Sequence, residues 1–242
     1  MTISYYTDVG RMRKENQDSV FAEQINDNTF LLIVADGMGG HNGGKTASAT
    51  AISAVSQYIR EKCKSTFNDD EAKHMLIESI SKANTEIYRR AFGNDKLKGM
   101  GTTAVVAIIT EKKLYTANVG DSRLYILSGD NFKQITTDHS YVESLLSKGL
   151  ISESEAKTHP QKNIITRAVG TDSFVDIDLF ENSLCDEDVV LICSDGLHTM
   201  VNDDDIVKIL NDDISTASQK LVSLANDNGG RDNISVIVVK IN

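Results

Sequence analysis

The arrangement of apolar residues at the start of the chain predicts three strands. They cover residues 3–7, 18–25 and 29–35, and the third carries the almost continuous apolar run FLLIVA. A run of this kind, without helical spacing, is typical of a buried strand. We therefore expect the fold to open with strands.

The period of the pattern then changes to that of helices. Apolar residues recur three or four positions apart in two successive segments, the first with Ile52, Val55 and Ile59, and the second with Leu76, Ile80, Ala83, Ile87 and Ala91. This spacing places each set on one face of a helix. Two adjacent helices are expected after the opening strands.

The middle of the chain returns to short β-rich segments. TTAVVAII, KLYTANV and SRLYIL lie between residues 101 and 134. Too few residues separate them for crossover helices, which predicts antiparallel pairing. A polar stretch at 138–163 is followed by strands near 175–181 and 188–193, a helix around 216–226 and a last strand, NISVIVVKI. Blocks of antiparallel strands and paired helices predict an α+β layered domain.

Composition favours one domain spanning residues 1–242. The 242 residues are 40% hydrophobic, enough for a sizeable core, and the single proline, Pro160, marks no linker. The longest apolar runs are too short to span a membrane, and the first residues lack the features of a signal peptide. We expect a cytoplasmic monomer that does not bind membranes.

Charge and cysteine usage exclude several other classes of function. A formal charge of -10 disfavours binding to nucleic acids and anionic membranes, which are held mainly by Lys and Arg. Cys63, Cys185 and Cys193 form no C-x-x-C pair. This spacing argues against a disulfide framework and a zinc site, and no cysteine lies in a phosphate-binding loop.

Two apolar strands run directly into Asp-Gly. They are LLIVADGMGG at residues 31–40 and VVLICSDGLH at 189–198. Asp-Gly is a common turn signal, so two tight turns are one interpretation. The other is that Asp36 and Asp195 are fixed oxygen ligands for a metal ion. Further candidates at strand boundaries are Asp18, Asp121 and Asp232.

A competing interpretation involves nucleotide binding. GGHNGGKT at residues 39–46 satisfies the P-loop pattern, in which Lys45 would reach the phosphates and Thr46 would bind magnesium. Three residues separate the apolar strand from the first glycine, however, and the antiparallel middle of the chain does not suit a parallel nucleotide-binding sheet.

A series of motifs extends along the whole chain and resembles a known family. In order and spacing, the chain is similar to the bacterial metal-dependent Ser/Thr protein phosphatases of type 2C through RMRKENQD, VADGMGGHNGG, GTTAVV, ANVGDSRLY, ITRAVG, LICSDGL and GGRDNISVIVV. The resemblance implies a four-layer α/β/β/α sandwich in which helix pairs flank two antiparallel sheets. It also implies a metal site at one end of the sheets and a flap at about 138–165.

The resemblance assigns the metal ligands residue by residue. Asp36 would bridge two Mn²⁺ or Mg²⁺ ions, and the Gly37 carbonyl would be a further ligand. Asp195 and Asp232 would complete the shell of the first ion. Asp121, with Asp195, would hold a third and weaker ion. A set of oxygen ligands suits Mg²⁺ or Mn²⁺ better than Zn²⁺.

Other roles also follow from the resemblance. Asp18 would accept a hydrogen bond from water at the metals, and Arg13 would clamp the phosphate with its planar fork. Asn233 would support Asp232. His41, in the glycine-rich turn, is our candidate for protonating the leaving alkoxide, although a histidine bonded to local backbone fits its position equally well.

Two positions depart from the family pattern. Gln17 stands where bacterial relatives usually have glutamate, so we assign no acid role there. His198 stands where a small hydroxyl residue is common, and it remains unassigned.

The implied reaction is hydrolysis of phosphoserine and phosphothreonine. A water molecule activated by the two metals would attack phosphorus without a phosphoenzyme. Phosphoproteins would be the substrates, and a bacterial Ser/Thr kinase would be the opposing enzyme. The alternative is a pseudophosphatase that binds phosphoproteins without hydrolysing them.

Overall fold

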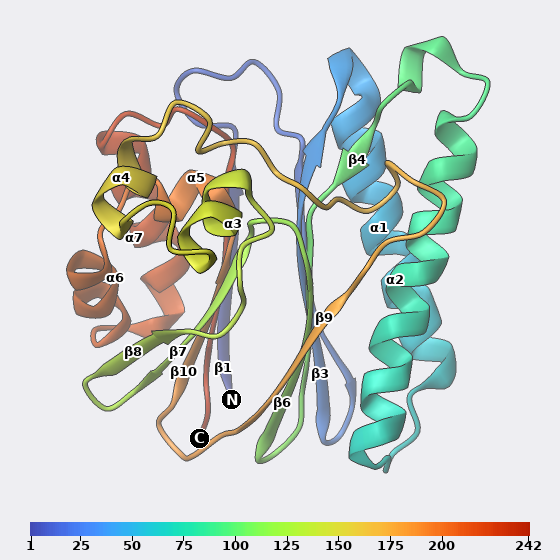
Figure 1. Cartoon of the computed structure of the whole chain (residues 1–242). Coiled ribbons are helices and arrows are strands. Elements are labelled where there is room, and N and C mark those ends of the chain that lie inside the picture. The colour runs from blue at the N-terminus through green and yellow to red at the C-terminus, as the bar shows by residue number, and fades with distance from the viewer.

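Two antiparallel sheets pack face to face, with helices on both outer faces (Figure 1). The computed structural model describes the backbone of all 242 residues and the side chains of residues 1–39, 43–156 and 158–242. The four-layer α/β/β/α sandwich predicted from the resemblance is confirmed.

The first sheet has five strands and the second has six. In spatial order, the first sheet contains β1 (Thr2–Asp8), β11 (Ile234–Lys240), β10 (Val189–Cys193), β7 (Arg123–Ser128) and β8 (Asn131–Gln134). The second contains β2 (Asp18–Asn26), β3 (Thr29–Met38), β5 (Ala104–Ile109), β6 (Lys113–Val119) and β9 (Asp178–Ser183), with β4 (Gly101–Thr102) paired to β3. The first and last strands of the chain are therefore neighbours.

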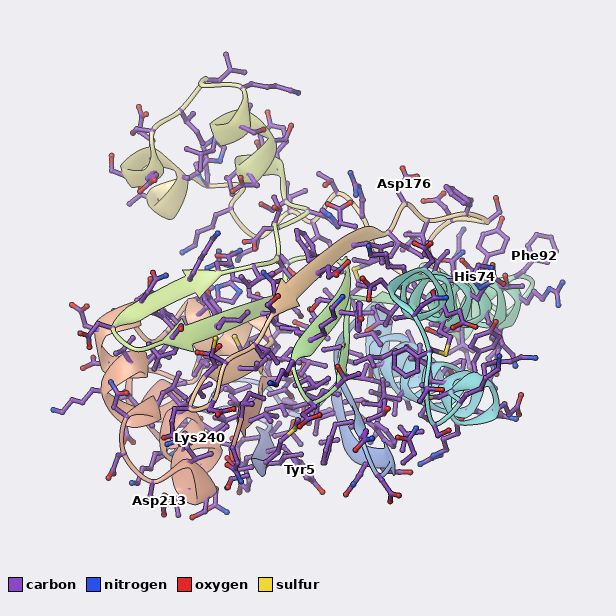
Figure 2. The ribbon with its side chains drawn as sticks, turned by 90° about the horizontal axis from the view of Figure 1, so that it is seen from below. Tyr5, His74, Phe92, Asp176, Asp213 and Lys240 are labelled. Atoms are coloured by element: carbon purple, nitrogen blue, oxygen red, sulfur yellow. The ribbon has the colours of Figure 1, made fainter. Side chains whose placement is uncertain are left out.

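Two long helices and a group of shorter ones form the outer layers. α1 (Gly40–Lys62) and α2 (Asp69–Ala91) cover the second sheet. The first sheet is covered by α5 (Asp195–His198), α6 (Asp203–Leu210) and α7 (Ile214–Asp227). A one-turn 3-10 helix (Asp95–Leu97) follows α2, and α3 (Tyr141–Ser147) and α4 (Glu153–Thr158) lie in the polar segment. Seen from below, α3 and α4 project beyond the sandwich (Figure 2).

The continuous apolar strands follow from this layering. In β3, Leu31, Ile33 and Ala35 face α1 and α2, whereas Leu32 and Val34 face the other sheet. Both faces of such a strand are buried, so the polar and apolar alternation of a half-exposed strand is lost. Three apolar layers result, one between the sheets and one beneath each helical layer.

Most predicted elements are present, with shifted ends. The strand expected near 175–181 is β9 at Asp178–Ser183, and the helix expected around 216–226 is α7 at Ile214–Asp227. α6 was not predicted, although its start signal is present. The Asn202 side chain accepts a hydrogen bond from the Asp205 backbone N-H, and three aspartates follow this N-cap residue in the first turn.

In the part of the chain that the structure describes, no helix has the length and apolar character needed to cross a bilayer.

We predict that truncation between the sheets destabilises the fold strongly. Ile192, in β10, has no exposed surface and packs in the layer between the sheets. Ile192→Ala should lower the free energy of unfolding by about 2–5 kcal/mol, because it removes buried methyl groups and leaves a cavity. Ile77→Ala is the matched control, because Ile77 is 36% exposed on α2, and it should change stability by roughly 0.5 kcal/mol or less. Urea unfolding of both variants tests this, and equal effects would contradict the assigned layers.

Candidate active site

Five aspartates lie where strands of both sheets begin or end. Asp18 is the first residue of β2 and pairs directly with Asp36 near the end of β3. Asp195 follows β10, and Asp232 precedes β11, its antiparallel neighbour. Asp121 lies in the turn between β6 and β7. The topology therefore brings all five to one end of the sandwich, the upper end in Figure 1.

The carboxylates of this cluster raise one another's pKa values. Burial is the largest cause that raises the pKa of Asp36 well above that of an ordinary aspartate, and the charges of Asp18, Asp195, Asp121 and Asp232 raise it further. Burial is also the largest cause that raises the pKa of Asp195, and the charges of neighbouring carboxylates raise it further. Like charges held together out of water disfavour ionisation, so the cluster is strained in electrostatic terms unless cations offset it.

Two oxygens of this cluster lack partners. Asp18 Oδ1 and Asp195 Oδ1 are buried and have no hydrogen-bond partner among the described residues. Buried polar atoms are almost always paired, and an exception points to a missing water or ion. The oxygens thus fit a hard divalent cation, which binds carboxylates, carbonyls and water.

The side chains do not form a complete cage. Within the described residues, no group of three or more His, Cys, Asp or Glu side chains is arranged to hold a metal ion by itself. A bound ion would take backbone carbonyls and water as further ligands, as Mg²⁺ usually does.

Asp18 is held by the opposite sheet. Its Oδ2 accepts a hydrogen bond of 2.8 Å from Ser194 Oγ, and Ser194 Oγ in turn accepts one of 2.9 Å from the Ser235 backbone N-H. Burial, the largest cause, raises the pKa of Asp18 to about 6, although the hydrogen bonds from Ser194 and Ser235 lower it. Ser194 is a site residue that the sequence interpretation missed, and its position directly before Asp195 was the available signal.

The glycines beside Asp36 permit a close contact between β3 and α1. A Cβ added at Gly37 would lie 2.1 Å from the Gly44 carbonyl oxygen. A Cβ at Gly44 would lie 2.5 Å from the Gly37 oxygen, and neither contact is possible with a side chain. The glycine-rich segment therefore packs a helix against the strand end that carries Asp36.

Lys45 pairs with a carboxylate of this chain, whereas the lysine of a P-loop binds the phosphates of a nucleotide. Its Nζ forms an exposed ion pair of 3.0 Å with Glu15 Oε1. The strands of both sheets are antiparallel, which also excludes the parallel sheet of a P-loop fold.

Arg13 reaches the carboxylate cluster from the loop between β1 and β2. Its Nη2 donates a hydrogen bond of 2.7 Å to Asp232 Oδ2, and this contact raises the pKa of Arg13. Asn233 fastens the loop, because its Nδ2 donates to the carbonyls of Val9 and Glu15. The Asn233 backbone N-H also donates to Asp232 Oδ1.

Two histidines hold the turn that carries Asp121. His198 Nε2 donates to the Asp121 carbonyl at 3.1 Å, and burial lowers the pKa of His198 to about 3, so the ring is neutral. On the other side, the Gly120 N-H donates to His139 Nδ1 at 3.0 Å. His139 Nε2 faces Asp178 Oδ2 at 3.1 Å. Neither histidine had an assigned role in the sequence interpretation, because their partners are distant along the chain.

Asp121 itself is also perturbed. Burial, followed by the charge of Asp138, raises the pKa of Asp121 to about 6. The structure thus brings Asp18, Asp36, Asp121, Asp195 and Asp232 together, with Gly37 and Arg13 beside them. The His41 side chain lies outside the described residues.

Comparisons with known proteins agree on one family. The family description "Protein phosphatase 2C" matches residues 11–226. The "Serine/threonine phosphatase stp" of Listeria innocua is 39% identical over 100% of this chain and 96% of its own. The structure of Staphylococcus aureus Ser/Thr phosphatase Stp1 superposes with a TM-score of 0.89 at 37% identity, covering 99% and 94% of the two chains.

A further solved structure contains metal. The catalytic domain of the Ser/Thr protein phosphatase PstP, in complex with two manganese ions, has a TM-score of 0.86 and 30% identity. It covers 98% of this chain and 96% of that one. Because the family description and full-length relatives agree with the fold and with the carboxylate cluster, the chain belongs to the protein phosphatase 2C family.

Proposed function

We propose that this Ser/Thr protein phosphatase hydrolyses its phosphoproteins at the cluster of five aspartates, with Mn²⁺ or Mg²⁺ bound there. The observation that carries this assignment is the pair of buried, unpartnered oxygens on Asp18 and Asp195 among mutually repelling carboxylates. The family relationship supplies the activity, and the geometry supports its location.

The proposed ligands are the oxygens that converge at the end of the sandwich. Asp36, the Gly37 carbonyl, Asp195 and Asp232 would hold two ions, and Asp121 with Asp195 would hold a possible third. When bound, divalent cations supply positive charge against the phosphate and make a water molecule more acidic.

The chain's own residues position the reactants. Asp18, fixed by Ser194, keeps Oδ1 free to accept a hydrogen bond from the attacking water. Arg13 is half-exposed, so its guanidinium can exchange the carboxylate of Asp232 for two phosphate oxygens. His41 remains our candidate donor of a proton to the leaving Ser or Thr oxygen.

The segment at about 138–165 is proposed as a flap that contacts substrates. Its two ends are joined, because Ser140 pairs with Ile165 and the Tyr141 N-H donates to the Ile164 carbonyl. The intervening helices are thus one unit on a closed base. Phosphopeptide selectivity after replacement of this segment by a short loop tests its role.

Cellular context is also a proposal. We propose that the enzyme opposes a Ser/Thr kinase, acts as a monomer and works in the cytoplasm. Comparison of phosphoproteomes with and without the protein, light scattering and cell fractionation test these three statements in turn.

Metal removal should affect both activity and stability. Excess chelator should abolish hydrolysis of phosphopeptides, and Mn²⁺ or Mg²⁺ should restore it. The pKa values of Asp18 and Asp121 rise to about 6, above the roughly 4 of an unfolded aspartate. The metal-free fold should therefore lose stability as the pH rises from about 4 through 6, since the folded state then binds more protons than the unfolded state.

Thermal unfolding measures that effect. Mn²⁺ should raise the Tm more at pH 7.5 than at pH 5. At pH 7.5 the carboxylates of the metal-free protein are ionised, and no positive charge offsets their repulsion. Full activity in excess chelator, or a Tm without response to Mn²⁺, would contradict the assigned metal centre.

Arg13→Ala should lower kcat/KM for phosphopeptides by roughly 10–100-fold, the equivalent of losing a hydrogen bond to a charged group. Stability should hardly change, because an exposed ion pair contributes about 0–1 kcal/mol. Arg13→Lys is the control: it keeps the charge without the fork and should recover only part of the rate. An unchanged rate at low substrate concentration would remove Arg13 from the site.

Two further variants separate phosphatase chemistry from nucleotide binding. Lys45→Ala removes only the exposed pair with Glu15 and should alter the rate by about 2-fold or less. Asp232→Asn keeps the side-chain size but weakens a proposed metal ligand, and should cost at least roughly 10–100-fold. Phosphopeptide hydrolysis and ATP binding are the measurements, and an inactive Lys45→Ala beside a fully active Asp232→Asn would reverse the interpretation.

A further inference from the structure

A surface groove runs between β1 and α7, and we call it the β1–α7 groove. Its volume is about 360 Å³, and it is lined by Tyr6, Asp8, Arg11, Gln219, Val222, Ser223 and Asn226. Tyr6 and Asp8 are two positions apart on one face of the strand, and the α7 residues recur at helical spacing on one face of the helix. The groove is thus built from two rigid elements, which Ser4 Oγ fastens together by donating to the Ile214 carbonyl at 2.7 Å.

The Arg11 end of the groove adjoins the active site. The Arg11 and Met12 N-H groups both donate to the Gly230 carbonyl, at 2.7 and 3.1 Å. A Cβ added at Gly10 would lie 2.1 Å from the Asp232 carbonyl oxygen, so this loop rests directly on the backbone of a proposed metal ligand. Since two residues span at most about 7 Å, Arg11 lies near Arg13, the proposed phosphate clamp.

The charge at this end differs from that of the whole chain. The chain carries a net charge of -10, yet Arg11, Arg13 and Lys14 are exposed in the loop between β1 and β2, and the exposed Arg231 directly precedes Asp232. Within the described part of the chain, no carboxylate forms an ion pair with Arg11. Local positive charge on an acidic protein favours an anionic partner.

The other charged group in the groove, Asp8, is held by hydrogen bonds within the chain. Asp8 Oδ1 accepts hydrogen bonds from the Gly10 N-H at 2.8 Å and from Asn226 Nδ2 at 3.0 Å. The hydroxyl and amide groups of Tyr6, Gln219 and Ser223 supply donors and acceptors of the kind that an extended peptide backbone needs. Arg11 is therefore the cationic group of the groove, and no carboxylate of the described residues pairs with it.

We propose that the β1–α7 groove binds the peptide segment next to the phosphorylated residue, and that Arg11 pairs with an acidic side chain about two residues from it. This inference rests on the proposed function, because it places the phosphate beside Arg13. It assigns a sequence preference to the enzyme: phosphorylated segments that contain a nearby glutamate or aspartate.

Three phosphothreonine peptides test the preference. One carries glutamate two residues before the phosphothreonine, one carries it two residues after, and the third has glutamine at both positions. One of the glutamate peptides should exceed the glutamine peptide in kcat/KM by about 2–5-fold, as expected for a partly exposed ion pair. The advantage should shrink as salt rises from about 0.05 to 0.5 M.

Two variants locate the preference. In Arg11→Gln, which keeps a polar stem over Gly230, the advantage of the glutamate peptide should disappear. In Arg11→Glu, it should reverse in favour of a fourth peptide that carries lysine in place of that glutamate. Lys14→Gln is the matched control, because it removes one charge from the same loop outside the groove, and it should keep the preference.

The rate at which each variant hydrolyses an aryl phosphate in the presence of Mn²⁺ serves as the reference. A wild-type enzyme without preference, or an equal loss in Lys14→Gln, would overturn the groove proposal. A fall in aryl phosphate hydrolysis in the same proportion as peptide hydrolysis in Arg11→Gln would do so too, since Arg11 would then act on the site itself. Absence of Mn²⁺-dependent aryl phosphate hydrolysis by the wild type would instead contradict the proposed function.

Discussion

Repulsion among buried carboxylates is the constraint that the rest of this structure must satisfy. Asp36 and Asp195 have raised pKa values because they are buried beside other aspartates. Such a cluster opposes folding at neutral pH unless cations bind to it, since each ionised carboxylate raises the cost of ionising the next. The ionised cluster therefore lowers the stability of the metal-free fold and attracts positive charge to this end of the molecule.

The remainder of the fold keeps that end in place. The two sheets share an apolar layer, and Ser194 joins Asp18 of one sheet to Ser235 of the other. Gly37 and Gly44 let a long helix pack against the same strand end without a side chain between them. Because the aspartates sit on strand ends rather than on free loops, their geometry is set by the sheets, as a preorganised site requires.

The loop between β1 and β2 places exposed cations beside the carboxylate cluster. Arg13 already pairs with Asp232, and Arg11 lines the neighbouring groove. An anionic substrate would otherwise meet a strongly acidic protein, which slows association. The cationic side chains in the loop between β1 and β2 offset the negative charge of the protein locally. The same loop can therefore bind the phosphate and the peptide segment beside it.

The sequence by itself determined the α+β class and the antiparallel middle, and it singled out the five aspartates that meet at one end of the sandwich, because each of these rests on local spacing or on an unbroken order of motifs. It did not predict α6, whose acidic first turn looks like solvated surface until its N-cap is recognised. Only the tertiary structure decided what those residues meet. Ser194, His139 and His198 acquire roles through partners far away in the chain. The β1–α7 groove likewise exists only because the first strand packs against a helix near the end of the chain. A local sequence pattern cannot predict a contact between residues so far apart in the sequence.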